Sequence, residues 1–278
     1  MTTFWNNTKT ALLLGLMFGL ILAAGAFFGK GGLIFAFLLG GGGAIISFFF
    51  SDKIALAAMR GKEVDEQSAP DLVRMVERLA RNANLPMPRV YICPQDAPNA
   101  FATGRSPRKS AVAVTRGALK LLSYDELEGV MAHELAHVKN RDTLISTIAA
   151  IIAGALTYLG YIGLFFGGGR DNPLGAIGMI LMIFLAPIAA ALIQMAISRS
   201  REYVADAQGA EIAGSPNGLI NALRKLDSMN KRVPMQNEMP SQNHMFIVQP
   251  LSGGGGLSSL FSTHPATEDR IAKLQQIV

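Results

Sequence analysis

The chain alternates between long apolar segments and polar regions, and this alternation is its strongest structural signal. Runs of 20, 21, 27 and 27 residues carry no charge, and they lie at positions 10–29, 31–51, 143–169 and 172–198. A helix rises about 1.5 Å per residue, so about 20 apolar residues cross a hydrocarbon core of roughly 30 Å. A buried core helix is the alternative for any one run, but four runs of this length favour transmembrane helices. The predicted spans are about 10–29, 31–51, 143–167 and 174–198.

These spans predict two hairpins that alternate with two polar regions. The predicted domains are an N-terminal transmembrane hairpin (1–51), a polar region (52–142), a second transmembrane hairpin (143–198) and a second polar region (199–278). Of the 25 Lys and Arg residues, 23 lie in the N-terminal segment and the two polar regions. Positive charge is retained on the cytoplasmic side of a membrane. We therefore expect a multi-pass membrane protein whose termini and polar regions are cytoplasmic.

The first polar region has patterns typical of a small α+β domain. Apolar residues recur at helical spacing over residues 70–82, and Pro86 follows this helix. Short strands are predicted at Arg89–Cys93 and Ala111–Thr115, with an extended segment over 98–104 between them, at a possible sheet edge.

A capping box, Ser123 with Glu126, predicts the start of a helix that runs through His137 and on into the third apolar run. The fourth apolar run is expected to continue as a helix through 199–213. Residues 228–260 lack helical or strand periodicity and predict a long mobile loop, and a last short helix is predicted at 266–277.

Composition narrows the function classes. Half of the residues are hydrophobic and 16% are charged, against roughly 25% charged in soluble domains. This excludes an intrinsically disordered chain and disfavours an ordinary cytosolic enzyme. The single cysteine, Cys93, rules out an intramolecular disulfide and fits a small strand residue. No aromatic-interleaved basic patch and no phosphate-binding loop occurs, so no nucleic-acid partner is expected.

The segment from His133 to His137 has the pattern His-Glu-x-x-His. Residues at i and i+4 share a helix face, so both imidazoles can reach one zinc ion, and Glu134 lies where it can take a proton from water. The same pattern is a metalloprotease signature. Two surface histidines on a helix are the alternative interpretation. The sequence therefore predicts His133 and His137 as metal ligands and Glu134 as the catalytic base.

A catalytic zinc site needs a third protein ligand. Glu202 is the best candidate because it lies on the helix that follows the fourth apolar run, while His244 and His264 remain possible. Asp206, four residues later on the same helix, could orient a ligating imidazole. A solvated helix face is the alternative for Glu202 and Asp206, and His244 is interpreted as incidental.

Beyond the zinc motif, three further segments carry a resemblance that covers nearly the whole chain. They are Asn140-Arg141-Asp142, Ser198–Asp206, and Ser262-Thr263-His264-Pro265 followed by Arg270-Ile271. With these motifs and its order of spans, the chain resembles the HtpX family of bacterial membrane zinc endopeptidases, which is related to the CAAX prenyl protease group. The resemblance implies a helical integral membrane protein with four transmembrane helices and a zincin-like (gluzincin) α+β catalytic domain with a small sheet.

The resemblance also implies site residues. One zinc ion per chain is held by His133, His137 and Glu202, with Glu134 catalytic. An edge segment, Asn99-Ala100-Phe101, pairs with an extended substrate. In the related prenyl proteases, residues at the spacing of His264 and Arg270 border the active site, which makes them possible oxyanion or substrate contacts. A histidine that caps the last helix and an arginine in a surface ion pair are the alternatives.

The function that follows is a membrane zinc endopeptidase that cuts cytoplasmic or juxtamembrane segments of proteins. The resemblance suggests membrane proteins, damaged or misassembled, as substrates in a stress-related quality-control role, and leaves the oligomeric state open. Two rivals remain. One is a non-catalytic membrane scaffold or transporter with a structural zinc site, which would need no glutamate at position 134. The other is an intramembrane protease, which the charges of Lys139, Arg141 and Asp142 disfavour.

Overall fold

The protein is described as a computed structural model, which covers residues 8, 12, 49–142, 145, 188, 197–232 and 265–277. The chain divides into two compact units, Met1–Phe49 with Ile145–Ile197, and Phe50–Leu144 with Ser198–Val278. No helix within the described ranges is both long and apolar enough to cross a membrane. The four predicted spans lie almost entirely outside the described residues. All elements below belong to the second unit, apart from Ile197, the first residue of one helical segment.

The second unit is built on a four-stranded mixed sheet with the order β1-β2-β4-β3. Its strands are β1 (Lys62–Val64), β2 (Arg89–Cys93), β3 (Ala100–Ser106) and β4 (Lys109–Thr115). β2 runs parallel to β4, with Arg89 opposite Ala111, whereas β1 and β3 pair antiparallel with their neighbours. The predicted strands at Arg89–Cys93 and Ala111–Thr115 are confirmed. The extended segment between them is β3, which lies at the sheet edge.

Successive strand residues point to opposite faces of the sheet. Both faces carry buried apolar residues, and helices cover both of them. Val90, Val112 and Val114 face a core that they share with α3 (Pro70–Asn82) and α5 (Tyr124–Asn140). On the other face, Tyr91, Cys93, Phe101, Ala111 and Ala113 pack with Leu56 and Met59 of the segment that contains α2 (Ser51–Ala58). A short helix, α4 (Arg116–Leu121), follows β4.

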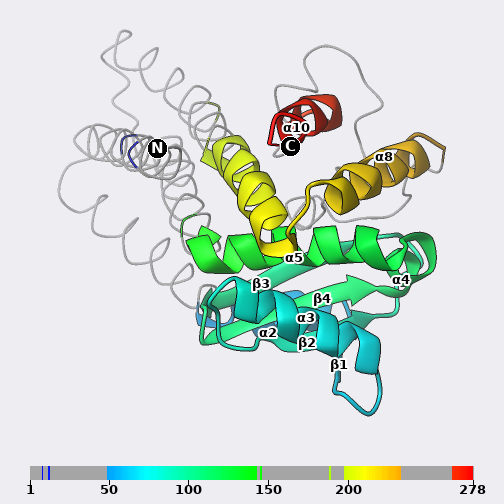
Figure 1. The fold of residues 1–278 in the computed structure, drawn as a ribbon. Coiled ribbons are helices and arrows are strands. Elements are labelled where there is room, and N and C mark those ends of the chain that lie inside the picture. Colours follow the sequence, from blue (N-terminus) through cyan, green and yellow to red (C-terminus); the bar gives the residue numbers. More distant parts are fainter. Residues whose placement is uncertain are drawn as a thin grey trace, which may run out of the picture. The chain divides into compact units, whose positions relative to one another are not determined.

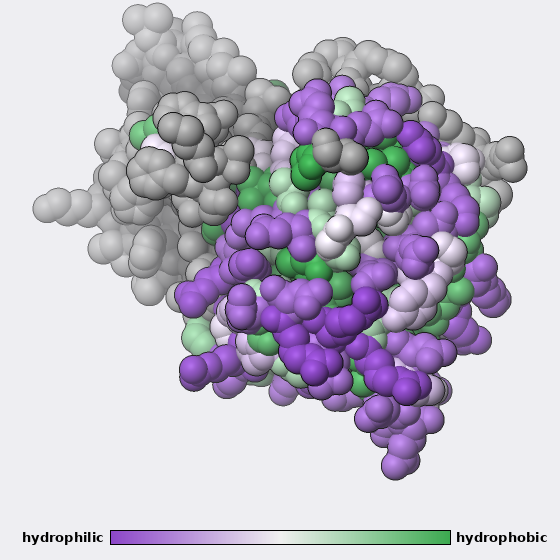
Figure 2. Space-filling view, viewed as in Figure 1, coloured by the Kyte–Doolittle hydropathy of each residue, from purple (hydrophilic) through white to green (hydrophobic). Residues whose placement is uncertain are grey.

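α3 confirms the predicted helix over 70–82. Leu72, Met75, Val76 and Leu79 are buried at helical spacing, so one stripe of the helix faces the core. Its charged residues point outward, and the surface over this part of the unit is mostly hydrophilic (Figure 2). The sheet is therefore covered by an amphipathic helix whose outer face is solvated.

α5 crosses the sheet, and the remaining helices lie on its far side (Figure 1). They are the helical segment 197–213, α8 (Asn217–Arg232) and α10 (Thr267–Leu274). α8 packs closely against α5, since a Cβ on Gly129 would lie 2.3 Å from the backbone nitrogen of Leu219. The sheet, α5 and these helices thus form successive layers, with α5 in the middle.

Two predictions about these helices are wrong. α5 does not continue uninterrupted beyond Val138: it ends at Asn140, and Arg141 takes a left-handed conformation with φ 56° that breaks the helix. The loop predicted over 228–260 does not begin at 228, because α8 extends to Arg232. Residues 233–260 lie outside the described part of the chain.

Candidate metal centre

The helix that carries the His-Glu-x-x-His motif begins at the predicted capping box. The Ser123 side chain accepts from the backbone N–H of Glu126, and the Glu126 side chain accepts from the backbone N–H of Ser123 at 2.8 Å. From this start α5 places His133 and His137 one turn apart on the same face. Their rings meet edge to face with centroids 4.6 Å apart, and the two Nε2 atoms lie 3.0 Å apart.

Glu202 reaches the two histidines from the helical segment 197–213. One of its carboxylate oxygens lies 3.6 Å from Nε2 of His133, and the other lies 3.4 Å from Nε2 of His137. The helices can approach this closely because Gly209 meets the backbone of His133 without a side chain between them. Glu202 is buried, so the interpretation of Glu202 as part of a solvated helix face is wrong.

Each of these three side chains offers one atom that could bind a metal ion, and these atoms all lie within 4.8 Å of one another. Two imidazole nitrogens and one carboxylate are the donor set found in catalytic zinc sites. Within the described part of the chain, four carboxylates (Glu134, Asp142, Glu202, Asp206) and two guanidinium groups (Arg201, Arg270) gather here, all buried. They leave two negative charges in excess, so the residues fit a divalent cation.

Asp206 lies next to Nδ1 of His133, whereas His137 and Glu202 lie next to Nε2 of the same ring. Its Oδ1 is 3.0 Å from Nδ1 of His133 and accepts from Nη2 of Arg270 at 2.6 Å, while its Oδ2 accepts from Nε of Arg270 at 2.8 Å. Burial alone would raise the pKa of the Asp206 carboxyl, but the adjacent guanidinium holds it below its ordinary value. Asp206 is therefore a fixed anion that can orient the imidazole of His133.

Arg270 is fully buried, so a surface ion pair is ruled out for this residue. Besides its two contacts with Asp206, its Nη1 lies 3.5 Å from a carboxylate oxygen of Glu202, and its Nη2 lies 3.5 Å from Nε2 of His133. α10 therefore carries a positive charge to the centre of the cluster. His264, its partner in the sequence motif, lies outside the described residues, as does His244.

Two residues to which the sequence assigned no role, Asp142 and Arg201, stand behind His137 in the same way. Asp142 Oδ2 lies 2.6 Å from Nδ1 of His137, and its Oδ1 accepts from Arg201. The segment Asn140-Arg141-Asp142 contributes to the family resemblance, but an uninterrupted helix would not bring Asp142 back to His137. The only signal in the sequence was an acidic residue just beyond the motif.

The histidines lie in negative surroundings. Burial by itself lowers the pKa of His133 and of His137, but the neighbouring carboxylates of Asp206, Asp142 and Glu202 outweigh burial and raise both values. A positive charge is therefore favoured at this position. Because a divalent cation and a proton respond to the same field, the electrostatics agree with the donor set.

Glu134 is buried beside the two histidines and contacts the sheet edge. Its Oε2 accepts from the backbone N–H of Ala102 in β3 at 2.7 Å. Burial raises the pKa of this carboxyl above its ordinary value, which makes the carboxylate a better proton acceptor. The backbone donor could not have been identified from the sequence, because every residue type except proline supplies the same N–H.

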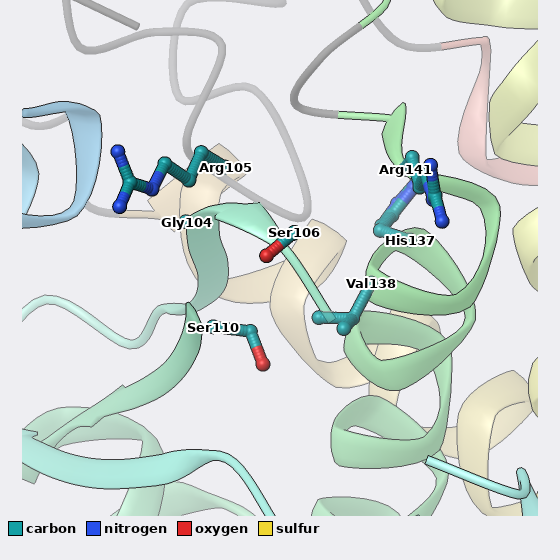
Figure 3. Close-up of a pocket in the computed structure, with 7 residues that line it drawn as sticks. All are labelled: Gly104, Arg105, Ser106, Ser110, His137, Val138 and Arg141. Atoms are coloured by element: carbon teal, nitrogen blue, oxygen red, sulfur yellow. The ribbon is translucent and has the colours of Figure 1, made fainter. Parts of the chain in front are cut away.

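A small pocket borders the site between the β3–β4 turn and the end of α5 (Figure 3). It is lined by Gly104, Arg105, Ser106, Ser110, His137, Val138 and Arg141. Asn99 and Ala100, by contrast, lie at the opposite end of β3. Cys93 is fully buried in β2, and burial raises the pKa of its thiol to about 11, in keeping with an inert strand residue.

Known proteins that are similar to this chain are peptidases, and the similarity covers nearly the whole chain. Residues 66–278 match the profile described as Peptidase family M48. The chain is 54% identical over 277 residues to the Protease HtpX homolog of Desulfatibacillum aliphaticivorans, covering 97% of this chain and 89% of that protein. It is 51% identical over 277 residues to the Protease HtpX homolog of Pelotomaculum thermopropionicum, with coverages of 97% and 98%.

The fold is also similar to the crystal structure of S. mikatae Ste24p, with a TM-score of 0.59 at 18% identity. This match covers 98% of the present chain and 66% of the Ste24p chain. At this level of identity the likeness concerns the fold alone.

Proposed function

The chain belongs to peptidase family M48 and is a metalloendopeptidase, and from this premise we propose that it uses zinc to cut extended protein segments at the cytoplasmic face of a membrane. The observation that carries the proposal is the convergence of His133, His137 and Glu202 within 4.8 Å, next to the buried Glu134. Family membership favours this enzyme over a non-catalytic scaffold or transporter with a structural zinc site.

In this proposal His133, His137 and Glu202 hold a single zinc ion. A zinc ion held there would polarise the scissile carbonyl and lower the pKa of a water molecule. Each histidine has its Nδ1 next to an aspartate, so each can direct Nε2 toward the metal. Zinc is supported over Mg²⁺ or Ca²⁺ by the two imidazole nitrogens, because those cations prefer oxygen ligands.

Glu134 is the general base and acid. It takes a proton from the attacking water and delivers it to the leaving amine, so both halves of the proton transfer use one carboxylate. The N–H of Ala102 holds Oε2 at 2.7 Å, which fixes the side-chain orientation and leaves Oε1 for the proton transfer. Arg270 lies beside the ligands, where its positive charge would stabilise a developing oxyanion; His264 is proposed to assist it.

The substrate is proposed to add to the sheet as a fifth strand along β3. In an antiparallel pair, hydrogen-bonded and non-hydrogen-bonded residues alternate. Asn99 accepts from the N–H of Thr115 in the direction of β4, whereas the N–H of Ala102 points away toward Glu134. Residues on the Ala102 phase of β3 therefore offer backbone groups away from β4. Within the predicted segment Asn99-Ala100-Phe101, this arrangement supports Ala100 as the residue whose backbone faces an added substrate strand.

The membrane part of the proposal depends on the sequence. The four apolar runs support two transmembrane hairpins, and the distribution of Lys and Arg supports a multi-pass inner-membrane protein with a cytoplasmic active site. Each polar region directly follows a predicted hairpin in the sequence, at Asp52 and at Arg199. Membrane proteins, including damaged or misassembled ones, are the substrates we propose, in a quality-control role.

A time course with the purified full-length protein tests this function. The protein is stripped with a chelator and supplied with zinc, then incubated with an unfolded protein and, separately, with a membrane protein of known topology. We expect zinc-dependent cleavage of both, with the cuts in the membrane protein confined to cytoplasmic and juxtamembrane segments when mapped by mass spectrometry. Cuts mainly at mid-span or in segments on the other side of the membrane would contradict the proposed location.

A further inference from the structure

The two histidines of the cluster have the same arrangement behind them. In each case the Nδ1 atom faces one oxygen of an aspartate, and an arginine from a different segment of the chain binds that aspartate. The two sets are His133–Asp206–Arg270 and His137–Asp142–Arg201. The first set includes residues already assigned to the active site. In the second set, His137 belongs to the metal site, but Asp142 and Arg201 have no assigned role.

The second set is tightly packed. Asp142 and Arg201 are both buried, at 7% and 6% exposure. Asp142 uses its two oxygens for different partners, with Oδ2 2.6 Å from Nδ1 of His137 and Oδ1 accepting from Nε and Nη2 of Arg201. The Nη2 group of Arg201 also donates to the backbone carbonyl of Asn140 at 3.0 Å. One guanidinium thus fixes both the aspartate and the end of α5.

The backbone is shaped to make this contact. In an uninterrupted helix, a residue five positions after His137 would lie about 140° away around the axis. Arg141 instead has φ 56°, in the left-handed region that residues other than glycine seldom adopt. This turn brings Asp142 back to His137. Arg141 is the C-cap residue of α5, and its left-handed conformation both ends the helix and turns the Asp142 side chain back toward a metal-site histidine.

We propose that Asp142 is a positioning residue for His137 and that Arg201 acts by holding Asp142; the inference rests on the proposed metal site. The Asp142 carboxylate accepts the Nδ1–H of His137, which fixes the tautomer with the Nε2 lone pair directed toward Glu202. Arg201 directly precedes Glu202 in the sequence. The ion pair of Asp142 and Arg201 therefore joins the segment that carries His137 to the segment that carries Glu202.

A purely structural ion pair would behave differently from a positioning one. Its loss would lower the unfolding temperature of the metal-free protein, but the folded molecules would bind zinc as before. A positioning pair changes the zinc affinity of the folded protein, because the ligand loses its preferred tautomer and orientation. The Asn variant separates the two: it keeps the size of Asp142, but its amide cannot serve both His137 and Arg201 as acceptor.

The test compares full-length Asp142→Asn and Asp142→Ala with the wild type and with Glu128→Gln. Glu128 lies on α5 and also pairs with an arginine, because its Oε1 lies 2.7 Å from Nη2 of Arg78. Arg78 belongs to α3, so this ion pair does not involve the histidines. Zinc affinity is measured by competition with a chromophoric chelator, and the absorption spectrum of the Co²⁺-substituted protein reports the geometry of the ligands. Unfolding temperatures of the metal-free proteins are measured in parallel.

We expect both Asp142 variants to bind zinc about 10–100-fold more weakly and to alter the Co²⁺ spectrum, while Glu128→Gln changes neither. Adding Arg201→Gln to Asp142→Asn should weaken zinc binding no further, because Arg201 acts through Asp142. Wild-type zinc affinity and an unchanged Co²⁺ spectrum in folded Asp142→Asn would overturn the inference. Failure of the wild type to bind zinc would instead contradict the proposed function.

Should Asp142→Ala fail to fold, Asp142→Asn and Arg201→Lys still decide the question. Arg201→Lys keeps the charge but loses the planar fork that binds Asp142 and the Asn140 carbonyl together. We expect intermediate zinc affinity for this variant, between wild type and Asp142→Asn. Affinity equal to wild type in Arg201→Lys and in Asp142→Asn would show that the pair serves stability alone.

Discussion

Gly209 lies against the backbone of His133 at the point where the two helices that carry the metal-site residues cross. A Cβ at position 209 would lie 2.9 Å from the Cα of His133 and 3.0 Å from its backbone nitrogen. Real side chains do not tolerate such a contact with backbone, so the helices would have to separate. The absence of a side chain at Gly209 thus allows Glu202 to approach His133 and His137.

Gly209→Ala should destabilise the protein and weaken its metal site together. Overpacking of this kind costs about 1–3 kcal/mol of the free energy of unfolding, and the shift falls on the helix that carries Glu202. Denaturant unfolding and zinc competition measure the two effects. Gly61→Ala is the matched control, because its new Cβ would meet a movable side-chain atom of Leu56 at 3.3 Å. An unchanged zinc affinity in Gly209→Ala would show that the crossing does not set the ligand geometry.

Glu134→Gln should separate catalysis from metal binding. The amide keeps the shape of the side chain but cannot accept a proton, and such losses reduce rates by about 10²–10⁴-fold. Zinc content should stay close to that of the wild type, since Glu134 is not one of the three converging ligands. Peptide hydrolysis and bound zinc are measured on the same preparation. Wild-type turnover in zinc-loaded Glu134→Gln would remove Glu134 from the mechanism.

Glu202→Ala and Asp206→Ala should differ in degree. The first removes a ligand, so zinc retention and activity should both be lost. The second removes the carboxylate behind His133, and such partners typically contribute about 10–100-fold in metal affinity. Zinc dissociation constants of the two variants make the comparison. If Glu202→Ala retains zinc with wild-type affinity, the third ligand lies elsewhere, and His264 is the next candidate.

The capping box should produce a pH-dependent contribution to stability. Burial alone would raise the pKa of Glu126, but hydrogen bonds from Lys225 and from Ser123 outweigh burial and lower it below its ordinary value of 4.5. A lowered folded-state pKa means that the stabilisation is complete above pH 4.5 and is lost as the pH falls through the lowered value. We expect Glu126→Gln to flatten this acid limb in urea unfolding between pH 3 and pH 6.

The same series needs a variant that leaves the capping box intact. Glu128→Gln serves, because Glu128 is only two residues away on α5 but pairs with Arg78 rather than with Lys225. Its stability profile should keep the acid limb of the wild type. An acid limb of equal size in Glu126→Gln would assign the pH dependence to other carboxylates.

Local rules predicted those parts of the fold that depend on neighbours in the sequence. The periodicity of residues 70–82 predicted α3, the β-branched runs predicted β2 and most of β4, and Ser123 with Glu126 predicted the start of α5. The proximity of His133 and His137 follows from helical geometry. Glu202 could be chosen because few acidic residues lie at a suitable position.

The remaining features depend on packing between distant segments. The break at Arg141 carries no glycine or proline, so no breaker residue signals it; it is compensated by contacts of Asp142 with His137 and Arg201 that exist only in the folded unit. α8 extends to Arg232. The composition of its last residues, from position 228 on, is typical of a loop, so the sequence predicted the loop to begin too early. The contact of Glu134 with the N–H of Ala102 involves backbone, which leaves no trace in the sequence.

The most direct test of the central account is a zinc titration of peptide hydrolysis. Chelator-stripped wild-type protein receives zinc in steps, and bound zinc and the rate of cleavage of an unfolded protein are measured at each step. The account predicts that activity rises in proportion to bound zinc and reaches its maximum at one zinc ion per chain, with His133→Ala remaining inactive throughout. Full hydrolysis by the stripped protein, or full zinc-dependent activity in His133→Ala, would contradict it.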